Sequence, residues 1–185
     1  AFRSLDGVDY LLPKDAIIIK DSSRIIDLVP LKGGENTAVS GQTKNVLLHS
    51  IICNPTAVRR VSQAIKLRSD SSTIAERGMD PNGTIIALTH ALILIGKLAD
   101  GEMASDILDH KAHEFKPWSL GLNLVKLEAV LGTPIAAKEV VDILNRLNLS
   151  PQLKKNKVTC TIPTYRGDIT IEEDLIEEVA RIHGY

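Results

Sequence analysis

Apolar residues in the first fifty positions occur in short runs rather than at helical spacing. Three such runs, rich in β-branched residues, lie at 15–21, 24–36 and 44–52. None of them alternates cleanly between apolar and polar positions, which is typical of strands buried on both faces. We therefore expect residues 2 to about 48 to be β-rich, and a further strand to continue to residue 52.

From Asn54 onward the apolar residues recur at helical spacing. Asn54 and Pro55 suit the cap and the first position of a helix that continues to about residue 67. A polar stretch, 68–78, separates it from a second apolar segment at 80–98, which also opens with an Asp-Pro pair. The apolar face of this second segment is wide, so we expect a helix buried against the strands.

The next segment, 109–119, has mixed charges, a proline and no apolar period, and predicts a linker or domain edge. His110 and His113 have a spacing that some metal sites use. No cysteine or third histidine lies nearby in the sequence, so a surface pair is the favoured interpretation.

The remaining chain has the pattern of a compact second unit. Residues 121–132 alternate as in a strand through Leu122 and Leu124, continuing to Val125 or Leu127, and residues 136–148 have helical spacing. Residues 149–163 predict two strands around a Lys-Asn-Lys turn, with one buried face made by the side chains of Val158, Cys160 and Ile162.

These elements together predict an α+β chain with two domains. The first, 1–112, is a strand-rich mixed α/β portion, and the second, 113–185, is a small winged-helix-like α+β domain. The second is about the smallest size that folds alone.

Composition narrows the possible functions. The net charge of −1 and the aromatic content of 3% argue against a dominant nucleic-acid surface or a base-stacking platform. Two distant cysteines favour a reducing, cytoplasmic setting. The longest apolar run, 91–96, is too short to cross a bilayer. The chain has no initiating Met and no signal peptide, and we expect it to be a piece of a longer protein.

The last twenty residues concentrate acidic side chains on a predicted helix. Thr170 and Glu173 match a capping box that would start the helix at Ile171, and Glu172 suits the positive end of the helix dipole. The apolar side chains at helical spacing predict an inward face made of Ile171, Leu175, Val179 and Ile182.

Four further carboxylates have two possible interpretations: Asp168, Asp174, Glu177 and Glu178. Like charges four residues apart on a helix repel one another, and carboxylate oxygens are the donors that Mg²⁺ prefers. Spacing alone favours a solvated acidic face, with Arg181 offsetting its neighbours. A magnesium site is the alternative.

The wider closing segment, "TIPTYRGDITIEEDLIEEVARIHGY" at 161–185, resembles the β subunit of bacterial-type phenylalanyl-tRNA synthetase. Pro163 to Ile169 match a Pro-S/T-x-R-x-D-I strand end, and the remainder matches E-x-D-L-I-E-E-V-A-R-I-x-G-Y, apart from His183 where the family usually has Tyr. The resemblance implies a magnesium site shared with the α subunit, with Asp168, Asp174, Glu177 and Glu178 as ligands.

The same resemblance implies partners and substrates. The family works as an α2β2 heterotetramer that charges phenylalanine tRNA, with ATP as a substrate bound by the complete enzyme. Its adenylate-forming site lies on the α subunit, so this chain alone is not expected to aminoacylate.

Four segments of the first half resemble the module of this subunit that hydrolyses tyrosine mischarged onto phenylalanine tRNA: "SLDGVDYLLPKDAIII", "LKGGEN", "NVLLHSI" and "ERGMDP". The implied editing positions are Gly33, His49, Ser69 and Ser71. Only Gly33 is unchanged, because His49 stands where the family has Glu, Ser69 where it has Thr and Ser71 where it has Ala. The family's aromatic in R-F-E-R is also absent. A neutral His can still accept a hydrogen bond, so this change alone weakens editing rather than excluding it. From all these departures together, we expect editing to be reduced or lost.

Three alternatives remain open from the residues. The chain could be a free-standing trans-editing deacylase or a purely structural interface module. It could also be a nucleic-acid-binding winged helix with Lys154, Lys155, Lys157 and Arg166 on phosphates, although lysines at a turn more often only face solvent.

Overall fold

The computed structural model describes residues 1–184, which form two compact units. The first comprises residues 1–79 and 83–109, and the second comprises residues 80–82 and the chain from His110 onward. The expected α+β class with two parts is confirmed. Each unit is described separately below.

The first unit begins with short antiparallel strands in two small sheets. One sheet pairs β1 (Phe2–Arg3) with β2 (Asp9–Tyr10). The other has the order β3-β4-β5, followed by a single 3₁₀ turn, η1: β3 (Ile18–Lys20), β4 (Ile25–Leu28), β5 (Lys32–Gly33) and η1 (Glu35–Thr37). The β-rich character of this region was therefore predicted correctly.

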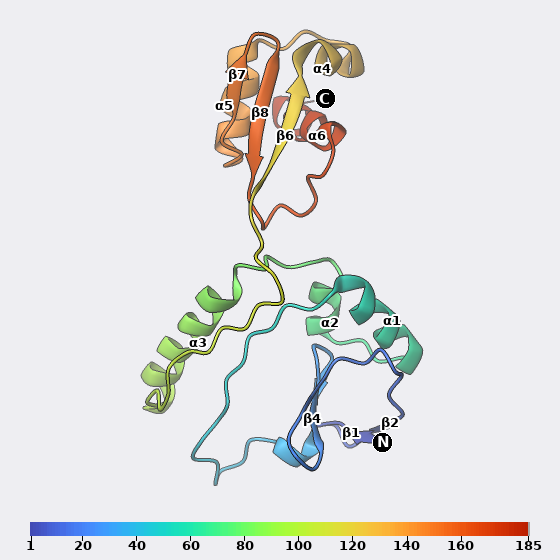
Figure 1. Ribbon diagram of the computed structural model, residues 1–185, viewed down its shortest axis with the longest axis vertical. Coiled ribbons are helices and arrows are strands. Elements are labelled where there is room, and N and C mark those ends of the chain that lie inside the picture. The colour runs from blue at the N-terminus through green and yellow to red at the C-terminus, as the bar shows by residue number, and fades with distance from the viewer. Residues whose placement is uncertain (185) are drawn as a thin grey trace. The chain divides into compact units, whose positions relative to one another are not determined.

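The strand expected at 44–52 does not form. Residues 43–54 run without a strand or helix, as the cyan trace in Figure 1 shows. A strand needs a neighbour to accept and donate its backbone hydrogen bonds. No described strand pairs with this segment, so its run of apolar residues was not enough to make it a strand.

Three helices follow in this unit: α1 (Pro55–Ile65), α2 (Asp70–Ala75) and α3 (Thr84–Ala99). α1 starts as predicted, because the Asn54 side chain accepts a hydrogen bond from the Ala57 amide at 3.1 Å. α2 lies in the stretch expected to be polar and without helix. Its start is made by a reciprocal capping box between Ser69 and Ser72.

The core of the first unit joins its strands to α1 and α2, but α3 adds no buried residue to it. The expectation that 80–98 is buried against the strands is therefore wrong: Ile86, Leu94 and Leu98 are each more than half exposed. The helix is apolar on nearly every side, and within the described chain the face that includes Leu88, Leu92 and Ile95 is only partly covered. Among the described residues, no helix combines the length and the apolar character that crossing a membrane requires.

The second unit is built on one antiparallel sheet with the order β6-β8-β7: β6 (Trp118–Asn123), β7 (Gln152–Lys154) and β8 (Lys157–Ile162). The predicted hairpin and its alternation are confirmed, since Val158, Cys160 and Ile162 are all fully buried. Leu122 of β6 lies opposite Val158 and is buried with it.

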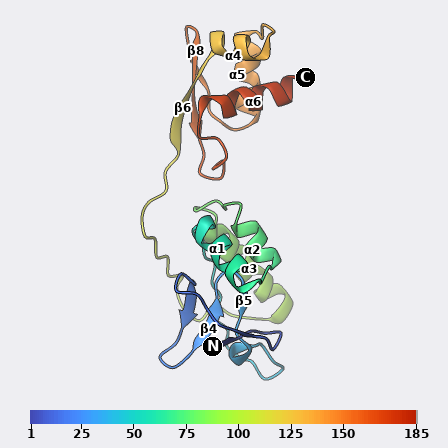
Figure 2. The same cartoon turned by 90° about the vertical axis from the view of Figure 1, so that its right-hand side faces the viewer.

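Three helices lie on one face of this sheet, as Figure 2 shows: α4 (Leu124–Leu131), α5 (Ala137–Arg146) and α6 (Glu172–His183). α5 was predicted. The strand expected to continue through Leu124 instead ends at Asn123, whose side chain accepts a hydrogen bond from the Val125 amide at 2.9 Å and so starts α4. The inward face of α6 buries Leu175 and Val179, but Ile171, which was expected there, is exposed.

Candidate functional sites

The four residues predicted from the editing-module resemblance line one open pocket of about 490 Å³ in the first unit. Gly33 lies in β5, His49 in the extended segment, and Ser69 and Ser71 at the start of α2. Backbone pairing in the sheet and the cap of α2 hold three of the four in place.

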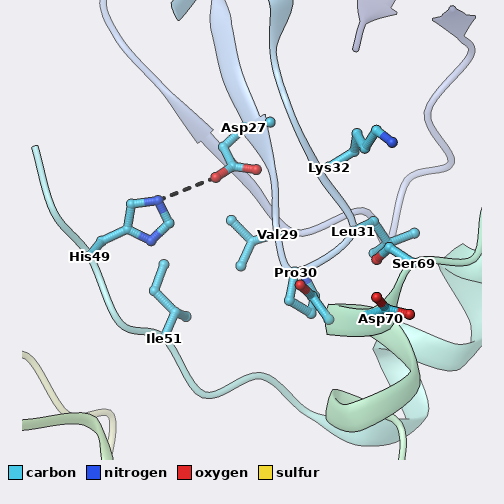
Figure 3. Close-up of a pocket in the computed structure, with 11 residues that line it drawn as sticks. Asp27, Val29, Pro30, Leu31, Lys32, His49, Ile51, Ser69 and Asp70 are labelled. Atoms are coloured by element: carbon cyan, nitrogen blue, oxygen red, sulfur yellow. Dashed lines mark ion pairs between the residues drawn. The ribbon is translucent and has the colours of Figure 1, made fainter. Parts of the chain in front are cut away.

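A fifth residue of the pocket, Asp27, faces His49 (Figure 3). His49 Nε2 lies 3.3 Å from Asp27 Oδ2, and the side chains are 41% and 22% exposed respectively. Burial raises the pKa of Asp27, while the neighbouring imidazole acts in the opposite direction. Sequence reasoning missed Asp27. The available signal was a lone carboxylate within the apolar run "RIIDLVP".

The two serines differ in what they can offer a ligand. Ser69 Oγ accepts from the Ser72 amide at 3.1 Å, and the Ser69 amide donates to Ser72 Oγ at 2.9 Å, so Ser69 serves the helix start. Ser71 is exposed.

The rest of the lining separates into apolar and polar parts. Val29, Pro30 and Ile51 lie between the His49 side and the α2 side, as Figure 3 shows. The charged side chains of Lys32 and Asp70 also line the pocket. Such a surface suits a small group with an apolar body and a polar end.

In the second unit, Arg166 connects two of the four predicted metal ligands. Its guanidinium lies 2.6 Å from Asp168 Oδ2 and 3.2 Å from Glu178 Oε2, and Arg181 lies 2.8 Å from the same Glu178 oxygen. The hydrogen bonds from Arg166 lower the pKa of Asp168, and those to Asp168 raise the pKa of Arg166. Both carboxylates are therefore already neutralised by a cationic side chain.

Asp174 makes the cap of α6. One of its oxygens accepts from the Thr170 amide at 2.7 Å and from the Ile171 amide at 2.9 Å, and these bonds lower the Asp174 pKa. The predicted capping box with Glu173 is therefore wrong by one residue. Glu173 instead lies 2.6 Å from the ammonium of Lys126.

Glu172 also turns to α4 rather than acting only on its own helix dipole. Its two oxygens accept from the Asn123 amide at 2.6 Å and from the Lys126 ammonium at 2.8 Å. The fourth predicted ligand, Glu177, is exposed, and its side chain has no hydrogen bond or ion pair within residues 1–184.

The donor chemistry of these carboxylates fits Mg²⁺, but their arrangement does not close around an ion. In the part of the chain that the structure describes, no three acidic, histidine or cysteine side chains converge as metal ligands. His110 and His113 are both exposed, and the ring of His113 packs at a tilt against that of Phe115. In the arrangement that residues 1–184 adopt, these carboxylates are bound to other groups or stand apart from one another.

The basic hairpin edge also differs from expectation. Lys154, Lys155 and Lys157 are exposed around the β7–β8 turn. Arg166 does not join them, because its guanidinium is bound to the carboxylates of Asp168 and Glu178.

Comparison with known proteins identifies both units. Residues 1–100 match the B3/4 domain, and residues 120–185 match the tRNA synthetase B5 domain. Since the first match covers more than half of the 185 residues, the chain belongs to the B3/4 domain family, and a B5 domain follows it.

The similar proteins are named phenylalanine–tRNA ligase beta subunits. That of Salinibacter ruber is 36% identical over 184 residues, which is 100% of this chain and 22% of the relative. That of Protochlamydia amoebophila is 37% identical over 185 residues, covering 100% and 23%. The chain thus corresponds to the B3/4 and B5 region of such subunits and spans about a fifth of their length. The family inferred from the closing motif is confirmed.

Proposed function

We propose that this chain is the editing and B5 part of a phenylalanine–tRNA ligase β subunit. It acts in the cytoplasm with an α subunit, in an α2β2 enzyme that charges phenylalanine tRNA using ATP. The observation that carries the editing assignment is the convergence of Gly33, His49, Ser69 and Ser71 on one pocket. The names of the relatives support the parent activity.

The substrate of the pocket is tyrosine esterified to phenylalanine tRNA. An apolar synthetic site rejects a side chain with one additional hydroxyl by only about 100-fold, so a second site must remove the error. The apolar surface of Val29, Pro30 and Ile51 suits the ring, and the imidazole of His49 suits the hydroxyl. Hydrolysis adds water across the ester and returns tyrosine and free tRNA.

We expect this editing to be slower than in a subunit with Glu at the position of His49. A carboxylate offers two acceptor oxygens, whereas a neutral imidazole offers one acceptor nitrogen. Ser71 adds a hydroxyl where the family has a methyl group, and Ser69 Oγ already caps α2.

The carboxylates of Asp168 and of α6 supply part of a magnesium site that the α subunit completes. Glu177 is exposed and available, whereas Asp168 and Glu178 would have to exchange Arg166 for the ion. Titration with Mg²⁺ should give measurable binding only when the α subunit is present. Equal binding by this chain alone would contradict a shared site.

The deciding experiment is deacylation of tyrosyl-tRNA by the protein that carries this chain, assembled with its α subunit. We expect tyrosine release above the protein-free rate, and loss of this release in His49→Ala. His90→Ala, which changes an exposed histidine of α3 outside the pocket, is the matched control. Aminoacylation without any tyrosyl-tRNA hydrolysis would refute the editing assignment. Hydrolysis by this chain alone at the full rate would favour a free-standing deacylase.

A further inference from the structure

The proposed function leaves one contact of the pocket unexplained, the ion pair formed by Asp27 and His49. Asp27 lies in the central strand β4, where its backbone is in register with Ile19 on one side and with Gly33 on the other. Its carboxylate is therefore held at the same end of the sheet as the glycine of the proposed editing site. The imidazole of His49 reaches it from the extended segment, at 3.3 Å.

We propose that Asp27 is a positioning residue, which holds His49 in the tautomer with the proton on Nε2, so that Nδ1 accepts the phenolic hydroxyl of tyrosine. This inference rests on the proposed editing function. It adds a residue that the family resemblance did not supply, and it assigns opposite roles to the two nitrogens of His49.

The tautomer follows from the chemistry of the two groups. A neutral imidazole has one N–H donor and one acceptor nitrogen, and an ionised carboxylate can only accept. The nitrogen that faces Asp27 must therefore carry the proton, and the other nitrogen keeps its lone pair. Within residues 1–184 no other side chain forms a hydrogen bond or ion pair with His49. The charged neighbour Lys32 is itself bound to Asp6 at 3.1 Å.

An acceptor placed in this way discriminates between the two amino acids. The hydroxyl of tyrosine donates to Nδ1, whereas bound phenylalanine would cover the same nitrogen and leave it without a donor. A polar atom left unpaired in this way opposes binding. The pair thus supplies the acceptor that the carboxylate at position 49 supplies in the family.

The proposal predicts that one substitution has opposite effects in two backgrounds. Asp27→Asn keeps the size of the side chain, but its amide can donate or accept and no longer fixes the tautomer. In the otherwise unchanged protein, we expect tyrosyl-tRNA deacylation to fall roughly tenfold, with a smaller change for phenylalanyl-tRNA. In His49→Glu, the two carboxylates oppose each other, so adding Asp27→Asn should raise the rate.

The experiment measures deacylation by Asp27→Asn, His49→Glu and the double variant, and combines these rates with a spectroscopic measurement. In this chain labelled with ¹⁵N-histidine, the His49 signal, assigned by its loss in His49→Ala, should show an unprotonated Nδ1. In Asp27→Asn it should move toward a mixture of tautomers. Asp15→Asn, an exposed acid in the same unit, is the matched control for both measurements.

The possible results separate the inference from the proposed function. If the assembled enzyme deacylates tyrosyl-tRNA and Asp27→Asn leaves both the rate and the tyrosine preference unchanged, the inference is wrong and editing stands. The same holds if the spectrum shows a proton on Nδ1. If the enzyme does not deacylate tyrosyl-tRNA at all, the editing function fails and the inference fails with it.

Discussion

The two units bury their apolar side chains to very different extents. In the second unit, each of α4, α5 and α6 places at least one residue in a core shared with the sheet. In the first, α3 has 16 residues, most of them apolar, and none is fully buried. By contrast, α5 is half polar but buries Val140, Ile143 and Leu144. The presence of a packing partner, more than the number of apolar residues, decides what is buried.

This difference has an energetic consequence. A buried leucine contributes its transfer from water together with its packing contacts, whereas an exposed leucine contributes almost nothing to folding. The second unit should therefore unfold as one cooperative body. The α3 helix should instead respond little to truncation of its exposed apolar side chains, such as Leu98.

The largest expected effect is the truncation of a core leucine in α6. Leu175→Ala should lower the free energy of unfolding of the second unit by about 2–5 kcal/mol, because Leu175 is fully buried. Trp118 is the only tryptophan of the sequence and its indole donates to the Ile169 carbonyl in this unit, so its fluorescence during urea unfolding reports this change.

Leu98→Ala is the matched control for this experiment, because Leu98 is 83% exposed on α3. We expect its effect on unfolding, followed by far-ultraviolet circular dichroism, to stay within about 0.5 kcal/mol. Equal losses in the two variants would show that α3 is covered in solution and would remove the contrast between the units.

The two cysteines provide a second comparison, because each unit contains one. Cys160 is fully buried in β8, and burial raises its pKa to about 11 from the ordinary 9.0, so its thiolate fraction falls about 100-fold. Burial also raises the pKa of Cys53, which keeps slight exposure. Alkylation followed by mass spectrometry should therefore label Cys53 first. Labelling of Cys160 at the rate of the unfolded chain would contradict the closed second core.

The sequence predicted best those elements whose ends and faces are set locally. Asn54 caps α1 with its own side chain. The alternation of buried and exposed side chains along 158–162 follows from a strand with one face covered. Sequence-based prediction failed where the outcome depends on a distant partner. Among the described residues, the apolar run at 44–52 has no strand beside it, and α3 is only partly covered on one face. Apolar patterning does not reveal whether such a partner exists.

The candidate sites also separate into features that the local sequence predicts and features that depend on distant residues. Neither spacing nor composition could bring Gly33, His49, Ser69 and Ser71 together, because three separate segments contribute them, and only the family resemblance named them. The family resemblance did not identify Asp27 either, because the role of Asp27 comes from its one contact with His49 across the pocket. On α6, the sequence pattern predicted Glu173 as the capping residue. In the structure, the Thr170 and Ile171 amides donate to Asp174 instead, so Asp174 is the capping residue.

The last and smallest expected effect concerns the ion pairs of Arg166 with Asp168 and with Glu178 of α6. Arg166→Met should lower the free energy of unfolding of the second unit by about 1–3 kcal/mol at neutral pH, because it removes a partner of Glu178. Glu178 is only 11% exposed and would keep Arg181 alone. The contact with Asp168 contributes less, since that carboxylate is 62% exposed and screened by water. Urea unfolding followed by Trp118 fluorescence measures the change.

The pH dependence of this loss follows from the direction of the Asp168 shift. Arg166 lowers the pKa of Asp168 from 3.8 in the folded protein, so this carboxylate adds stability above pH 3.8 and loses that contribution as the pH falls further. The difference in free energy of unfolding between Arg166→Met and the unchanged chain should therefore become smaller below about pH 4. Arg146→Met, which changes an exposed arginine of α5, should leave stability unaltered at every pH. If this difference in free energy of unfolding instead grew as the pH fell, ion pairs between Arg166 and the carboxylates of Asp168 and Glu178 would not be the source of the stabilisation.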